Sequence, residues 1–158
     1  MLYCCMAKRV TNGIAGESLV VAELSLLGHI ATLTLKNTPN FDILASNIDG
    51  TRLVAIDVKS SEDGDRFKLG KKDEKWIHKE CGNVFYVFVA LKAKKANEEN
   101  KFYVVNAREV AEKIKEYKAQ TSNTLTRKGT LGNNNNQREF HISKHFTGTK
   151  NDFSILGL

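Results

Sequence analysis

The chain has 158 residues and a mass of 17.7 kDa, which is long enough to bury one sizeable hydrophobic core. Hydrophobic residues make up 41% and charged residues 27% of the sequence, and this composition excludes wholesale disorder, a coiled coil and collagen. Lys and Arg number 24 against 18 Asp and Glu, so the net charge of +6 suits an anionic partner. We expect a single domain over residues 1–158.

The first part of the chain predicts one helix followed by three strands. Apolar residues recur at helical spacing over residues 13–27, and Gly28 is a typical helix stop. Alternation of apolar and polar residues then predicts strands at 30–35, 41–46 and 53–60. The sequence Asn-Ile-Asp-Gly at 47–50 predicts a turn between the second and third strands.

The second part predicts a charged surface segment, two strands and a helix. Residues 61–83 are rich in lysine, and a short helix is expected near 73–80. Residues 84–91 are the most apolar of the chain, so we expect a strand buried on both faces at the centre of the sheet. A strand at 102–105 and an amphipathic helix at 107–118 follow.

The last part predicts a loop and one more strand. Residues 119–137 are rich in Thr, Ser, Gly and Asn and are expected to form a mobile loop. A strand is expected at 138–143, so the C-terminal strand and tail cover 138–158 and the core covers about 13–118. This order of elements predicts an α/β/α sandwich with a mixed central sheet flanked by helices.

The short length of the apolar runs and the odd number of cysteines favour a cytoplasmic protein. The apolar patch before Lys8 is too short for a signal peptide, and no run reaches the roughly 18 apolar residues of a membrane span. Three cysteines are an odd number and are expected as free thiols. His78 and Cys81 have a metal-like spacing, but without a second pair they read as a loop histidine and a buried small side chain.

An acid and a base share one face of the strand predicted at 53–60. The period of two places Asp57 and Lys59 on the same side, opposite to Val58. Charged groups in an apolar strand are costly to bury unless they are paired or bind an ion. A plain ion pair on a solvated face is the alternative explanation.

A second acid lies in the preceding predicted strand. A hairpin between the two strands brings Asp42 beside Asp57, and two neighbouring carboxylates repel each other. A shared divalent cation relieves this repulsion, and ligation by oxygen alone favours Mg²⁺ or Mn²⁺.

A third acid lies on the predicted first helix. At 100° per residue, Glu17 falls within the stripe formed by Val20, Val21, Leu24 and Leu27. An acid on this face needs a partner. The alternative is a carboxylate near a helix start that the helix dipole stabilises.

Gly16-Glu17 on a first helix, Asp42 on a strand and Asp57-Val-Lys59 on the next strand resemble the PD-(D/E)xK nuclease superfamily, which has the restriction-endonuclease-like fold. The layout is most similar to small nucleases of the Holliday-junction-resolvase type. The resemblance implies a nuclease that cleaves DNA phosphodiester bonds with Mg²⁺ or Mn²⁺ and works as a homodimer. It implies that Asp42, Asp57 and Glu17 hold the metal, and that Lys59 orients or activates the attacking water.

The lysine-rich segment is the expected nucleic-acid contact. Lys71, Lys72 and Lys75 provide positive charge for phosphates, and Trp76 is a candidate for stacking on a base. The alternatives are solvated lysines and a tryptophan packed in the interior. Two rival functions also stay open: a non-catalytic module that binds nucleic acid or protein on the same fold, and an α/β domain whose acids form surface pairs.

Overall fold

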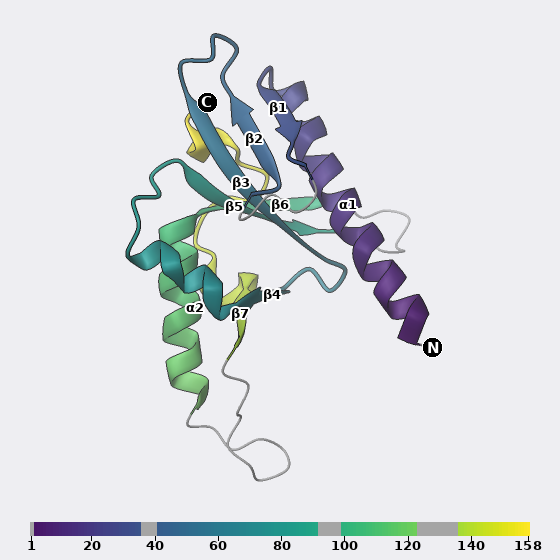
Figure 1. The fold of residues 1–158 in the computed structure, drawn as a ribbon, viewed down its shortest axis with the longest axis vertical. Helices are drawn as coiled ribbons and strands as arrows, with labels where there is room; N and C mark the ends of the chain where they lie inside the picture. The colour runs from purple at the N-terminus through teal and green to yellow at the C-terminus, as the bar shows by residue number, and fades with distance from the viewer. Residues whose placement is uncertain (1, 36–40, 92–98, 123–135) are drawn as a thin grey trace.

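The computed structural model describes residues 2–35, 41–91, 99–122 and 136–158. A five-stranded sheet has the order β1-β2-β3-β5-β6, and β4 and β7 form a separate pair (Figure 1). The strands are β1 (Ile30–Leu33), β2 (Ile43–Ser46), β3 (Leu53–Ser61), β4 (Arg66–Gly70), β5 (Val84–Ala90), β6 (Lys101–Asn106) and β7 (Gln137–His141). The helices are α1 (Leu2–Leu26), α2 (Ala107–Ser122), α3 (Ile142–His145) and the 3-10 helices η1 (Lys71–Ile77) and η2 (Ser154–Leu156).

The large sheet is mixed. Strands β1, β2 and β3 form an antiparallel meander, β3 pairs with β5 in parallel, and β5 pairs with β6 antiparallel. The predicted turn closes the β2–β3 hairpin, where Gly50 has a φ of 71° that favours glycine. The predicted mixed sheet with flanking helices is therefore confirmed.

The two faces of the sheet are covered by different layers. Helix α1 packs Val20 and Leu24 on the face of β3 that carries Ile56 and Val58. Helix α2, η1 and the β4–β7 pair lie on the opposite side of the sheet (Figure 1). Their buried side chains pack against Tyr86 and other residues of β5. Strand β5 is buried along its whole length because both layers cover it, as its apolar sequence predicts.

Helix α1 approaches β3 very closely at one point. A Cβ atom on Gly16 would lie 1.8 Å from Oγ of Ser60, so only glycine allows this contact. At its C-terminal end the helix stops as predicted. Gly28 adopts a φ of 87°, and His29 N donates to Leu24 O at 2.9 Å.

Several predicted elements need correction. Helix α1 begins at Leu2 rather than residue 13, because the apolar stripe marks only the part of the helix that packs on the sheet. The strand predicted at 84–91 lies inside the sheet between β3 and β6 as expected, although β3 occupies the middle position. Strand β4, within the charged segment 61–83, was not expected.

The C-terminal predictions are partly outside the described residues. The predicted loop 119–137 falls largely on residues 123–135, which the structure does not describe, while residues 119–122 continue α2. The strand expected at 138–143 ends at His141 and is followed by α3. None of the described helices is both long and apolar enough to span a membrane.

Candidate functional site

Two aspartates face each other across the β2–β3 hairpin. Asp42 N donates to Ile56 O at 2.9 Å, and Val58 N donates to Asp42 Oδ2 at 2.8 Å. Ile43 is paired with Ile56 in the same ladder, so extending the register by one residue places Asp42 opposite Asp57. The hairpin thus brings the two acids together as expected.

Asp57 is an acid in an apolar position. Its residue surface is only 9% exposed, and burial raises the pKa of its carboxyl group to about 6. Lys59 lowers that pKa, whereas the negative charges of Asp42 and Asp73 raise it. Ionising Asp57 therefore costs free energy, because the side chain is desolvated and lies near the negative charges of Asp42 and Asp73. The positive charge of Lys59 offsets part of this cost.

Lys59 is the cation of this group. Its Nζ donates to Asp57 Oδ1, and it lies 5.9 Å from the centre of the Tyr86 ring. Burial alone would lower the pKa of Lys59, but the charge and hydrogen bond of Asp57 outweigh it, so the pKa is raised. The alternation predicted for β3 holds, since Asp57 and Lys59 point away from α1.

The acid pair has oxygen atoms available for a ligand. Among the described residues, no hydrogen bond reaches Asp42 Oδ1 or Asp57 Oδ2, because the bonds to these two acids use the other oxygen of each carboxylate. Two neighbouring carboxylates fit Mg²⁺ or Mn²⁺, which keep several waters in their coordination shell. The donor set present therefore suits a hard divalent cation.

Glu17 is not gathered with the two aspartates. It follows Gly16 on α1, which covers the β3 face of Val58 and Ser60, and this face is opposite to that of Asp57. Within the described part of the chain, no three His, Cys, Asp or Glu side chains form a group that could hold a metal ion. The expected set of three carboxylates is thus reduced here to the Asp42–Asp57 pair.

Asp73 and Tyr86 are site neighbours that the sequence analysis missed. Tyr86 is the register partner of Asp57, and its hydroxyl donates to Asp73 Oδ1 at 2.8 Å. Gly70 N donates to the other oxygen of Asp73 at 2.7 Å, and Asp73 is only 4% exposed. Burial, Asp57 and Asp73 together raise the pKa of Tyr86. The phenol therefore stays protonated. Its ring lies beside the ammonium group of Lys59, and we call this ring the Tyr86 platform.

The lysine-rich helix η1 packs over the Tyr86 platform. Lys71 and Lys72 are exposed, as a phosphate contact requires, and Lys75 Nζ lies 4.6 Å from the centre of the Trp76 ring. Trp76 itself is 7% exposed and packs against Phe41 at 6.0 Å between ring centres. The prediction that Trp76 stacks on a base needs correction, because its ring is used in packing.

The metal-like spacing of His78 and Cys81 does not form a metal site among the described residues, since His78 is exposed and Cys81 packs in the interior. Cys81 is buried, and its thiol donates to Trp76 O at 3.5 Å. Among the described residues Cys81 is a free thiol, as expected.

Comparison with known proteins identifies the fold. No protein-family model and no curated protein matches the chain. The structure is similar to the 1.6 Å structure of Hjc, a Holliday junction resolvase from the hyperthermophilic archaeon Archaeoglobus fulgidus. The TM-score is 0.50 and the identity 15%, over 84% of this chain and 86% of that chain. The likeness confirms the predicted restriction-endonuclease-like fold.

Proposed function

We propose that this protein is a nuclease that cleaves DNA phosphodiester bonds with a divalent metal ion. The observation that carries the proposal is the placement of Asp42 opposite Asp57, with Lys59 hydrogen-bonded to Asp57 on an otherwise apolar strand. The likeness in fold to a Holliday junction resolvase supports it. A net charge of +6 suits a polyanionic substrate.

Asp42 and Asp57 are the residues that would hold the metal, with Mg²⁺ or Mn²⁺ as the ion. When bound, such an ion supplies positive charge to the phosphate and lowers the pKa of a coordinated water. The raised pKa of Asp57 supports this role, because an acid that is costly to ionise alone gains most from a nearby cation. Glu17 is assigned no ligand role, and a Glu17→Gln variant with wild-type metal affinity would agree with this.

Lys59 is the residue proposed to act on the reacting groups. Its ammonium group can donate a hydrogen bond to the attacking water or to a phosphate oxygen. Both roles need Lys59 beside the metal ligand Asp57, where the structure has it. The hydrogen bond from its hydroxyl to Asp73 holds the Tyr86 ring in place. The ring in turn restricts where the Lys59 side chain can lie.

We further propose that two copies act together on branched DNA. A junction resolvase must cut two strands, and the resemblance therefore implies two sites. Ile30, Leu44 and Leu53 are exposed apolar residues on neighbouring strands of one sheet face, which supports a second copy as their partner. Sedimentation of the wild type and of Leu44→Lys tests this, and a wild-type monomer at all concentrations would contradict it.

The decisive experiment is a cleavage panel on linear, nicked, branched and single-stranded DNA. Activity should appear with Mg²⁺ or Mn²⁺, vanish in EDTA, and be lost in Asp57→Asn and Asp42→Asn. Glu112→Gln, an exposed carboxylate on α2, is the matched control and should cleave like the wild type. Metal-independent DNA binding without cleavage would instead support the non-catalytic module, and absence of both metal and DNA binding would support a surface ion pair.

A further inference from the structure

A cleft opens beside Lys59, at the end of β3. Its volume is about 460 Å³, and its walls include Asn12 and Gly13 of α1, Lys59 of β3, and Arg66 and Lys68 of β4. Lys59 therefore contacts both the carboxylate pair and this cleft. Lys59 is thus the residue that links the carboxylate pair to the cleft.

The charge of the cleft favours an anion. Three basic residues line it, and its two acids are engaged by protein N–H groups. Glu62 Oε1 accepts a hydrogen bond from Asn12 Nδ2 at 2.9 Å, and Asp63 Oδ1 accepts one from Arg66 N at 2.8 Å. The described residues provide no ion pair to Lys68, whose side chain is exposed on β4. Arg66 Nε lies 3.8 Å from Asp63 Oδ2 in an exposed ion pair, and Lys59 is paired with Asp57. Lys68 and the exposed Arg66 therefore carry the positive charge that a phosphate would meet in the cleft.

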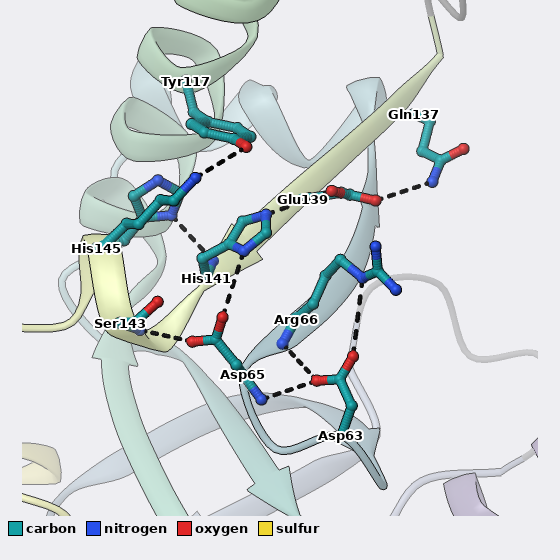
Figure 2. Close-up of polar contacts among 10 residues, drawn as sticks. Asp63, Asp65, Arg66, Tyr117, Gln137, Glu139, His141, Ser143 and His145 are labelled. Carbon is teal, nitrogen blue, oxygen red and sulfur yellow. Dashed lines mark hydrogen bonds and ion pairs between the residues drawn. The ribbon is translucent and has the colours of Figure 1, made fainter. Parts of the chain in front are cut away.

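The wall formed by β4 is held in place by a polar network (Figure 2). Asp65 Oδ1 accepts a hydrogen bond from Ser143 N at 2.7 Å, and Asp65 Oδ2 lies 3.5 Å from Nδ1 of His141. The other ring nitrogen of His141 lies 3.3 Å from Glu139 Oε2, so the ring is held between two carboxylates. These contacts hold the β3–β4 turn against β7 and α3. The hydrogen bond from Arg66 N to Asp63 Oδ1 fixes the backbone at Arg66.

The size of the cleft fits one nucleotide. Pockets of about 300–1,000 Å³ hold single small ligands, and a cleft of about 460 Å³ therefore has room for one nucleotide. We propose that this cleft receives one unpaired nucleotide next to the scissile phosphate, with Arg66 and Lys68 binding its phosphate. This inference rests on the proposed function and deepens it, because it makes DNA with an unpaired nucleotide beside the cut the preferred substrate class.

Gly13 allows the cleft to be blocked without a clash. A Cβ at this position meets no atom within 4 Å, so a larger side chain enters open space. Any other non-proline residue also favours the helix more than glycine does. Gly13→Phe is therefore the blocking variant, and Gly13→Ala is its control with little added volume.

The test measures the binding of two fluorescent DNA probes in EDTA, where metal-dependent cleavage cannot occur. One probe is an intact duplex, and the other is the same duplex with a short single-stranded gap. The wild type and Gly13→Ala should bind the gapped probe severalfold more tightly than the intact duplex. Gly13→Phe should bring the ratio of the two dissociation constants close to one, and retention of the wild-type ratio would overturn the proposal.

A second measurement tests the phosphate contact. For the gapped probe, the slope of log K against log salt should become shallower by about 2 in the Arg66→Ala, Lys68→Ala double variant. Lys101→Ala, on the exposed edge strand β6, should change the slope no more than one nonspecific contact does. An unchanged slope in the double variant would remove both residues from the binding surface.

These outcomes separate the cleft from the nuclease proposal. The expected binding ratios in a protein that never cleaves DNA would support the cleft and refute the nuclease. Metal-dependent cleavage with unchanged discrimination in Gly13→Phe would support the nuclease and refute the cleft.

Discussion

Replacing Asp57 by asparagine should stabilise the metal-free protein at neutral pH. The pKa of Asp57 is about 6 in the folded chain against 3.8 for a free aspartate. This difference corresponds to a cost of about 3 kcal/mol for keeping the ionised acid in the folded state. Because the folded pKa is raised, the cost is absent below pH 4, grows as the pH rises to 6, and is constant above it.

The figure of about 3 kcal/mol already includes the attraction of Lys59, because Lys59 is one of the groups that set the pKa of Asp57. The assay is urea denaturation of the wild type and Asp57→Asn in EDTA, at pH values from 4 to 8. The free energy of unfolding of the variant should exceed that of the wild type at pH 8, and the difference should shrink toward pH 4. A variant that is less stable at pH 8 would refute the reasoning, because the ion pair with Lys59 would then dominate.

Adding metal should reverse the order of stabilities. If Asp42 and Asp57 hold Mg²⁺ or Mn²⁺ as proposed, the ion binds the folded wild type and not the unfolded chain, so it should raise the unfolding free energy with concentration. Asp57→Asn should show little of this increase, and Glu112→Gln should show all of it. Equal increases in the wild type and Asp57→Asn would place the metal elsewhere.

Three further predictions concern side chains around the pair. Gly16→Ala should cost about 1–3 kcal/mol of stability, because its Cβ meets Ser60, whereas Gly13→Ala on the same helix should not destabilise; thermal melts compare the two. Lys59→Met should lower the single-turnover cleavage rate by about 100-fold or more while DNA affinity stays near wild type, since the group acts mainly in the transition state; a parallel loss of affinity would argue against this role. Asp73→Ala should cost about 1–3 kcal/mol by leaving the buried Tyr86 hydroxyl unpaired, as denaturation should show, and Asp73→Asn should recover part of it.

The local part of the site could be predicted from the sequence. Asp57 and Lys59 follow from the period of two in one strand, and Asp42 follows from a hairpin with a recognisable turn. Both arguments involve residues that are close in the chain. The general fold followed for the same reason, because most of its elements carry their own apolar pattern.

The non-local part could not be predicted. Strand β4 pairs with β7, which begins almost seventy residues later, and neither pattern identifies the other. Asp73 lies in the lysine-rich segment, and the sequence analysis did not single it out. The available signal was its spacing of three from Trp76, since residues i and i+3 share a face of a 3-10 helix and both are buried.

The β2–β3 hairpin has a consequence for folding. Both carboxylates lie within one short antiparallel ladder, whose closure is entropically cheap and can occur early. The parallel pairing of β3 with β5 needs a longer loop and brings in Tyr86 only afterwards. A chain emerging during synthesis can therefore bring Asp42 and Asp57 together before Tyr86 lies beside Lys59.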